Sequence, residues 1–154
     1  MKNFLKILFI FVMLSTNNVR ADLVKPNNGI EPYQVVKIKL RGLMNNDNPY
    51  KDVGIEQTWE FAHPNNQKYT GPLEKFKSML KGNDYSMLLN HSDHEVVEIF
   101  ISENVATYEV TVLDVEKKYY KFKWQVEKFN KEGPLKDCWL TTAVSQPISL
   151  GSSI

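Results

Sequence analysis

Residues 54–76, GIEQTWEFAHPNNQKYTGPLEKF, contain the helix and turn signals that decide the fold of this chain. Apolar or small residues recur there at three- and four-residue spacing, which places one stripe on a short helix. They are Ile55, Thr58, Trp59 and Ala62. Pro64 is predicted to end this helix, because the residue before a proline is disfavoured in the helical conformation.

A turn and a second helix are expected directly afterwards. Residues 65–68 have turn chemistry, since asparagine side chains bond to nearby backbone and tolerate unusual dihedral angles. Thr70 or Gly71 can cap the second helix, and Pro72 suits its first turn, where a missing N–H costs nothing. Its predicted inward face consists of Leu73, Phe76, Met79 and Leu80, and Gly82 is a plausible stop.

These residues resemble a domain-of-unknown-function family of plants and bacteria, with a pattern close to G-I-E-x-x-W-x-F-A-x-P-x-N and then T-G-P-L-x-x-F. The matching positions are Gly54, Ile55, Glu56, Trp59, Phe61, Ala62, Pro64, Asn66, Thr70, Gly71, Pro72, Leu73 and Phe76. The resemblance extends from about residue 32 to about residue 144, with further matches at Tyr85, 88–91 and 138–139. The family is similar to the nuclear transport factor 2-like superfamily, with its cystatin-like α+β fold. The resemblance implies no reaction and no ligand.

The N-terminus predicts export. Residues 1–21 combine a basic start, an apolar run from Ile7 to Leu14 and a small-residue end, which is typical of a cleaved signal peptide. An uncleaved membrane-surface anchor is the alternative, whereas the run is too short to span a bilayer. Removing residues 1–21 changes the formal net charge from +1 to −2, so no nucleic-acid partner is expected.

The mature chain is expected to be one domain, residues 32–146, between a polar lead at 22–31 and a C-terminal tail at 147–154. A helix should begin at Pro32 and end in the breaker cluster 45–49. Its predicted inward face is Val36, Leu40, Leu43 and Met44, with Lys37, Lys39 and Arg41 largely outside it.

From residue 95 the hydrophobic period changes from helical to alternating. One strand should place Val97, Ile99 and Ile101 on a single face, and a second strand covers 105–114. The third alternates most regularly, with Tyr120, Phe122, Trp124 and Val126 facing one way, and 137–144 is the fourth. The prediction is therefore an α+β fold, with N-terminal helices packed on a curved, cone-like antiparallel sheet of four or more strands.

Such a sheet curled around a helix tends to leave a pocket at its open end. The aromatic residues expected to line it are Trp59, Phe76, Tyr85, Tyr108, Trp124 and Trp139. Ordinary core filling is the alternative for each of them.

Residues 90–95, NHSDHE, form the one cluster of side chains in the sequence that could carry catalytic or metal-binding chemistry. His91 could act as a general base, with Tyr85 or Glu56 as its polar partner, or hold a loop by a hydrogen bond. No metal site is predicted, because two histidines three apart give too few ligands and His63 lies in another loop. No cofactor is predicted either. Cys138 is the sole cysteine, which excludes an intramolecular disulfide, and it is expected to be a buried hydrophobic residue.

Two functional hypotheses follow. The first is an exported, noncatalytic domain that binds a small apolar ligand or another protein, with a homodimer through the exposed face of the sheet. The second is a cofactor-free lyase, isomerase or hydrolase-like enzyme with His91 in an aromatic pocket. For Glu56, a hydrogen-bonding role is expected rather than a catalytic one.

Overall fold

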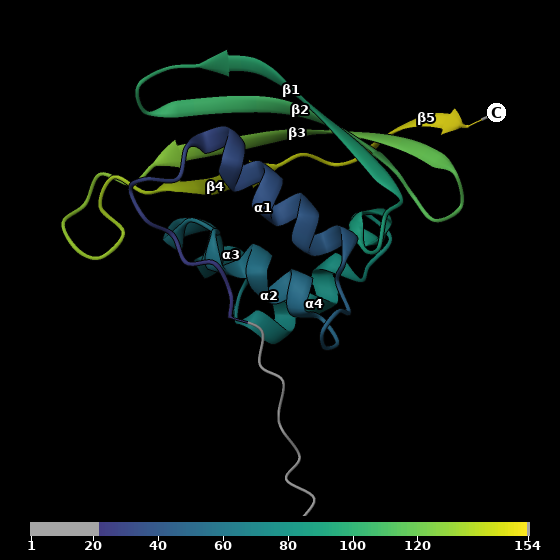
Figure 1. Cartoon of the computed structure of the whole chain (residues 1–154), viewed down its shortest axis with the longest axis horizontal. Coiled ribbons are helices and arrows are strands. Elements are labelled where there is room, and N and C mark those ends of the chain that lie inside the picture. The colour runs from purple at the N-terminus through teal and green to yellow at the C-terminus, as the bar shows by residue number, and fades with distance from the viewer. Residues whose placement is uncertain (1–21, 154) are drawn as a thin grey trace, which may run out of the picture.

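A computed structural model describes residues 22–153 and shows an α+β fold with the helices N-terminal to the strands. Four α-helices lie under one face of a twisted, open antiparallel sheet (Figure 1). The predicted signal peptide at 1–21 lies outside the described residues. Within the described part, no helix is both long and apolar enough to cross a bilayer.

The helical layer consists of α1 (Pro32–Met44), α2 (Val53–Glu60), α3 (Pro64–Thr70) and α4 (Leu73–Leu80), followed by the 3-10 turn η1 (Ser86–Leu88). The start of α1 has a capping box, in which Glu31 and Gln34 each satisfy the backbone N–H of the other. Pro32 occupies the first turn, as the sequence predicted. The predicted breaker cluster ends this helix at Asn45.

The predicted turn at 65–68 is wrong, because these residues form α3. Pro64 begins this helix, since its missing N–H is one that the first turn leaves unbonded in any case. His63 is the N-cap and accepts a hydrogen bond from the backbone N–H of Asn65 at Nδ1, 3.0 Å away. The proline is thus both a stop for α2 and a start for α3.

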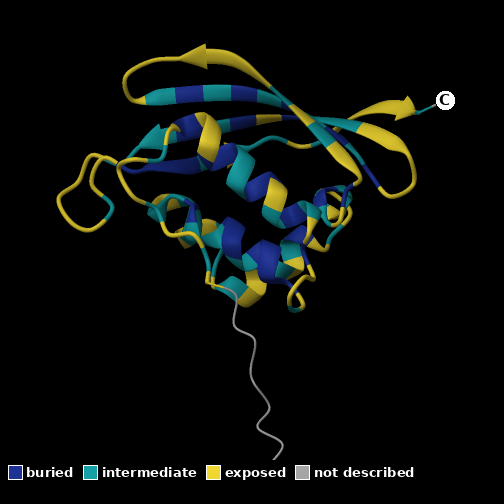
Figure 2. Ribbon diagram, in the orientation of Figure 1, coloured by how far each residue is buried: buried dark blue, intermediate teal, exposed yellow. Residues whose placement is uncertain are grey.

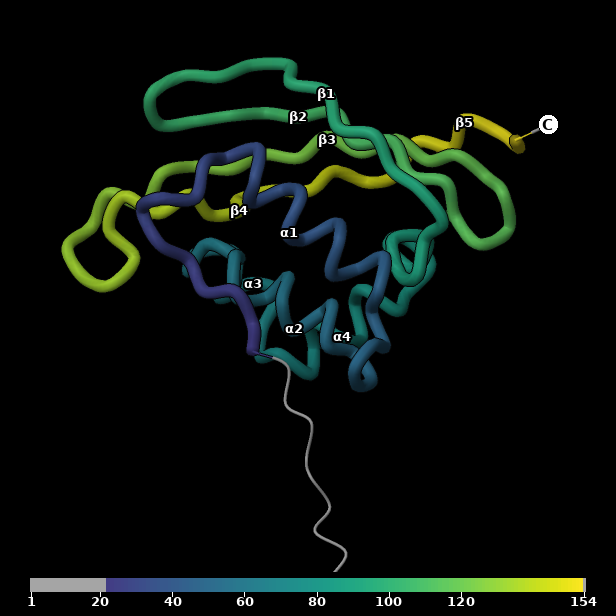
Figure 3. The backbone as a smooth tube through the Cα atoms, in the orientation of Figure 1, coloured from purple at the N-terminus to yellow at the C-terminus, as the bar shows by residue number. Residues whose placement is uncertain are grey.

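The sheet contains β1 (Asp93–Ile101), β2 (Val105–Leu113), β3 (Lys118–Lys128), β4 (Trp139–Val144) and β5 (Ile148–Ser152). Its order is β1-β2-β3-β4, and β5 also pairs with β3. Strand β4 lies beside the second half of β3 and β5 beside the first half, so the two follow one another along the same side of β3 (Figure 3). The strand β5 occupies the segment that the sequence predicted to be a polar tail.

The single face predicted for Val97, Ile99 and Ile101 is wrong. A bulge between Glu98 and Phe100 breaks the alternation of β1. Val97 is therefore opposite Glu109, whereas Ile101 is opposite the buried Ala106. All three predicted residues are about half exposed, since the helices do not cover this end of β1 (Figure 2).

The core lies between α1 and the sheet. From the helix it takes Val35, Val36, Leu40 and Leu43, all fully buried. From the sheet it takes alternate residues of β2 and β3: Ala106, Tyr108, Val110, Val112, Phe122, Trp124 and Val126. The face predicted for the third strand is confirmed at Phe122, Trp124 and Val126, and Tyr120 is half-buried.

The polar lead at 22–31 is attached to α2. The backbone N–H of Val24 donates to Oε1 of Gln57 (2.8 Å), and Nε2 of Gln57 donates to the carbonyl of Val24 (2.9 Å). Lys25 also forms an ion pair with Glu60, 2.8 Å away. This reciprocal pairing gives the lead a defined path across the helical layer.

Candidate functional site

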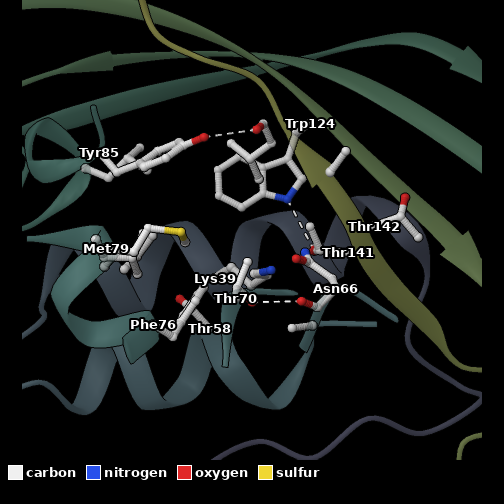
Figure 4. Close-up of a pocket in the computed structure, with 16 residues that line it drawn as sticks. Lys39, Thr58, Asn66, Thr70, Phe76, Met79, Tyr85, Trp124, Thr141 and Thr142 are labelled. Carbon is white, nitrogen blue, oxygen red and sulfur yellow. Dashed lines mark hydrogen bonds between the residues drawn. The ribbon is translucent and has the colours of Figure 1, made fainter. Parts of the chain in front are cut away.

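A cavity of about 180 Å³ lies between the helical layer and the second half of the sheet. Sixteen residues line it, and most of the lining is apolar (Figure 4). Its apolar wall includes Leu43, Phe76, Met79, Leu80 and Leu88, and its polar groups come from Lys39, Thr58, Asn66, Thr70 and Thr141. This combination of apolar wall and few polar groups is typical of a small-molecule site.

The loop between α2 and α3 fixes one side of the cavity by pairing with β4. The backbone N–H of Thr141 donates to the carbonyl of Phe61 (2.7 Å), and the N–H of His63 donates to the carbonyl of Thr141 (2.8 Å). Ala62 consequently forms an isolated parallel bridge with Thr141. These two backbone hydrogen bonds attach the helical layer to β4 next to the cavity.

Lys39 is the unusual residue of this cavity. Its side chain extends from α1 into the space (Figure 4), and only 2 % of the residue is exposed. Nζ lies 5.4 Å from the ring centroid of Trp124, which is a cation–π distance. Nζ has no hydrogen-bond or ion-pair partner among the described residues. Burial therefore lowers the pKa of Lys39 from 10.5 to about 7.

The placement of Lys39 outside the inward face of the helix is wrong. Lys39 is three residues after Val36 and four before Leu43, so it belongs to the same apolar stripe as both. Lys37 is half-buried and Arg41 is exposed, which agrees with the prediction. Helical spacing alone could have identified Lys39, because a lysine in the middle of an apolar stripe is uncommon in an ordinary core.

The other polar groups of the cavity retain some hydrogen-bonding capacity. The hydroxyls of Thr58 and Thr70 donate to the backbone carbonyls of Gly54 (2.8 Å) and Asn66 (2.9 Å), which leaves their lone pairs free to accept. The carboxamide of Asn66 makes no hydrogen bond to any residue in the described range. Lys39 and Asn66 are therefore the two nitrogen-bearing side chains of the cavity whose N–H donors lack an acceptor among the described residues.

Three of the six predicted aromatic residues line the cavity, namely Phe76, Tyr85 and Trp124. Trp124 Nε1 donates to the hydroxyl of Thr141 (3.3 Å). The Tyr85 hydroxyl donates to the carbonyl of Val144 (3.3 Å), and burial raises the pKa of Tyr85.

The remaining three aromatic residues lie elsewhere. Trp59 packs against Phe76, with ring centroids 5.1 Å apart, on the outer side of the helical layer. Trp139 is under Lys128, whose Nζ is 5.3 Å from its ring centroid. Tyr108 is fully buried between α1 and β2, and its hydroxyl has no hydrogen-bond partner in the described part of the chain. Burial raises the pKa of Tyr108 to about 12.

His91 does not line the cavity but belongs to a hydrogen-bonded chain beside it. Its Nδ1 lies 2.7 Å from the carbonyl of Leu88, and its Nε2 lies 2.7 Å from Nδ1 of His94. Nε2 of His94 in turn lies 3.1 Å from Nζ of Lys37. A carbonyl only accepts and an ammonium only donates, so a single arrangement of protons satisfies all three hydrogen bonds of this series. Lys37 donates to His94, His94 donates to His91, and His91 donates to Leu88.

Both imidazoles are neutral in this arrangement. Burial lowers the pKa of His91, and burial together with the charge of Lys37 lowers the pKa of His94 to about 4. Since every ring nitrogen is bonded, the histidine chain braces the turn that presents Leu88 to the cavity.

The family-like motif residues hold the helical layer together. A Cβ on Gly54 would lie 2.1 Å from the carbonyl oxygen of Gly42, so α1 and α2 cross at a contact that only glycine permits. Gly71 similarly leaves room for the ring of Trp59, and Pro72 is the N-cap of α4. Glu56 accepts hydrogen bonds from the Tyr50 hydroxyl (2.8 Å) and from Lys77 (3.0 Å), which links α2 to α4.

The described residues offer no cluster of three or more His, Cys, Asp or Glu side chains that could hold a metal ion. Cys138 is buried, and burial raises the pKa of its thiol, which reduces its nucleophilicity. No family model, curated protein or solved structure matches this chain. The family resemblance seen in the sequence therefore stays a prediction.

Proposed function

We propose that this chain is a noncatalytic small-molecule-binding domain whose ligand occupies the cavity beneath β3 and β4 and presents one oxygen acceptor to Lys39. The observation that supports this proposal is Nζ of the buried residue Lys39, which faces the cavity without a hydrogen-bonding partner among the described residues. An unpaired amine or ammonium in an apolar enclosure is energetically unfavourable. A ligand oxygen would supply the missing acceptor.

The size and walls of the cavity limit the ligand. A cavity of about 150 Å³ lined by aliphatic and aromatic side chains can hold benzene. The cavity of about 180 Å³ seen here would hold a single ring with one small substituent. The face of Trp124 and the side chains of Phe76 and Met79 would pack on the ring, and Lys39 would bond to the substituent.

Three probes of similar shape test this function: toluene, benzoate and benzylamine. We expect benzoate to bind at least tenfold more tightly than toluene, since a charge-assisted hydrogen bond contributes about 1.5–3 kcal/mol. Benzylamine should not bind, because its cation would face Lys39. Binding is measured from the NMR resonance of the Trp124 indole N–H, assigned with a Trp124→Phe variant.

Two variants serve as controls. Lys39→Met should remove the preference for benzoate while toluene still binds, and Ala62→Leu should weaken both probes, because Ala62 lines the cavity. The proposal is abandoned if none of the probes shifts the Trp124 resonance, or if Lys39→Met leaves the preference for benzoate unchanged.

The enzymatic alternative with His91 as a general base has less support. His91 does not line the cavity, and both of its ring nitrogens are already hydrogen-bonded. The expected partners Tyr85 and Glu56 are bonded to Val144 and to Lys77, respectively. We further propose that binding takes place outside the cytoplasm, on the strength of the signal-peptide pattern at 1–21.

The exposed end of β1 favours self-association as a second candidate function. Val97, Ile99, Phe100 and Ile101 are each 45–55 % exposed, and β1 is an edge strand with unpaired backbone groups. Antiparallel pairing with β1 of a second copy would satisfy these groups and cover the apolar side chains. Sedimentation velocity should then show a dimer that Phe100→Lys dissociates; a monomer at all concentrations would exclude this candidate.

A further inference from the structure

We propose that Lys39 captures small aldehydes covalently, as a Schiff base formed inside the cavity. This inference rests on the proposed function, because the aldehyde must first occupy the same space. It adds the chemical class of the ligand, which is a compact, largely apolar molecule with an unhindered carbonyl group.

The surroundings of Nζ suit a nucleophilic amine. An ordinary surface lysine is a solvated ammonium, whereas Nζ of Lys39 has neither a carboxylate to hold its proton nor a backbone carbonyl within bonding distance among the residues described. The ring centroid of Trp124 lies 5.4 Å from Nζ. The lowered pKa of Lys39 agrees with this geometry, since near neutral pH much of the group is then an uncharged amine.

The condensation uses groups that already line the cavity. The lone pair of Nζ forms a bond to the carbonyl carbon, the carbonyl π electrons move to oxygen, and a proton from nitrogen reaches that oxygen to give a carbinolamine. The nitrogen lone pair then forms the C=N bond as the hydroxyl leaves as water. Both amine hydrogens therefore depart with the carbonyl oxygen, and no oxidant or reductant is needed.

Asn66 is suited to assist the first step. Its carboxamide lines the same cavity and makes no hydrogen bond within the described chain, so its N–H can donate to the carbonyl oxygen as negative charge develops. The hydroxyls of Thr58 and Thr70 keep lone pairs that can accept a hydrogen bond from the carbinolamine hydroxyl. The apolar wall limits the access of bulk water, which would otherwise hydrolyse the imine.

The test is reductive trapping of benzaldehyde with sodium cyanoborohydride at pH 7, followed by peptide mass spectrometry. A surface lysine with a pKa near 10.4 has roughly one neutral amine in several thousand at this pH, whereas about half of Lys39 is neutral. We expect the peptide with Lys39 to be modified at least tenfold faster than the peptide with Lys25, whose side chain is 66 % exposed. This comparison within one protein requires no variant.

Two control conditions and two variants separate covalent capture from binding. Excess benzoate should slow the modification of Lys39 and leave Lys25 unaffected, and protein unfolded in urea should lose the selectivity. Lys39→Arg keeps a donor in the cavity and should bind benzoate, but it cannot form the imine. Asn66→Ala should slow trapping at Lys39 several-fold.

The outcomes distinguish this inference from the proposed function. If benzoate binds and benzaldehyde leaves Lys39 no more modified than Lys25, the covalent inference is wrong and the binding function stands. If benzoate fails to bind as well, both fail. Selective modification of Lys39 that benzoate suppresses supports both.

Discussion

Replacing the buried lysine with methionine should change how stability depends on pH. Lys39→Met keeps the length of the side chain and removes its ionisable group. In the folded protein the pKa of Lys39 is about 7, whereas the unfolded chain has a value near 10.4. Between these values the unfolded state binds the extra proton, so the wild-type protein gains stability as pH rises. The limiting slope is about 1.4 kcal/mol per pH unit.

The size of the stability change follows from the interval between the folded and unfolded pKa values of Lys39. Below pH 7 the folded and unfolded states are both protonated, so the full cost of burying the charge is present. Between pH 7 and pH 10 the wild type should regain about 4 kcal/mol relative to Lys39→Met. The variant should therefore be the more stable protein at pH 6–7, and its advantage should shrink towards pH 10.

Urea unfolding of both proteins at half-unit steps from pH 6 to pH 10, followed by far-UV circular dichroism, measures this difference. Titration of the other lysines and tyrosines contributes equally to both proteins and cancels when the free energies of unfolding are subtracted. A difference that stays constant within 0.5 kcal/mol across the range would show that Lys39 keeps a normal pKa, and the reasoning about its environment would be refuted.

Three further substitutions, one of them with a matched control, test other parts of the structure. Gly54→Ala should lower the free energy of unfolding by at least about 3 kcal/mol, because the added Cβ meets the Gly42 carbonyl. The control Gly82→Ala should change it by less than about 1 kcal/mol. Equal effects of the two substitutions would contradict the close contact between α1 and α2 at Gly54. Tyr108→Phe should leave the free energy of unfolding unchanged or raise it by up to about 1 kcal/mol, since it removes an unpartnered hydroxyl; a clear loss of stability would reveal a hidden partner. The contribution of His94 to wild-type stability should be complete above pH 6.5 and should be lost towards pH 4, because His94 is protonated in the unfolded chain first. His94→Asn, which keeps a donor at the Nδ1 position, should remove roughly 2 kcal/mol of that loss in acid urea titrations. Parallel acid profiles would count against the neutral histidine chain.

The sequence predicted the fold class because its two hydrophobic periods are segregated. The helical period ends before residue 93 and the alternating period follows it, which leaves one arrangement of layers. Phe122, Trp124 and Val126 alternate with charged or polar residues, so the sequence predicted the buried face of β3 directly. Pro32 and the asparagine cluster likewise marked both ends of α1.

The wrong secondary-structure predictions arise where the sequence carries an ambiguous signal or none. Pro64 ends one helix and begins another, and the asparagines after it have low helix propensity, so α3 resembled a turn. The bulge in β1 has no glycine to mark it. Strand β5 is short and exposed along its whole length, so it lacks the apolar alternation that identifies a half-buried strand.

The cavity was harder to predict than the fold, because its lining comes from segments distant in the chain. Phe76, Tyr85 and Trp124 come from three different segments and meet beside the contact between the loop before α3 and β4. Nothing local distinguishes Trp124 from Tyr108, which occupies an equivalent buried position on the neighbouring strand. Lys39 was accessible through helical spacing, but lysine is usually assigned to the solvent face.

Two sets of side-chain nitrogen atoms in the described part of the chain differ in a way that bears on function. In the chain from Lys37 through His94 to His91, every nitrogen has a partner, so folding alone accounts for these residues and their removal should destabilise the turn at Leu88. Lys39 has no such partner, and an apolar side chain at this position should make the protein more stable. Because Lys39 lowers the stability of the folded protein, its presence indicates a role in binding another molecule. The Lys39→Met comparison therefore tests more than a pKa: a more stable variant that can no longer discriminate benzoate from toluene would show that the stability given up at Lys39 is recovered when the ligand binds.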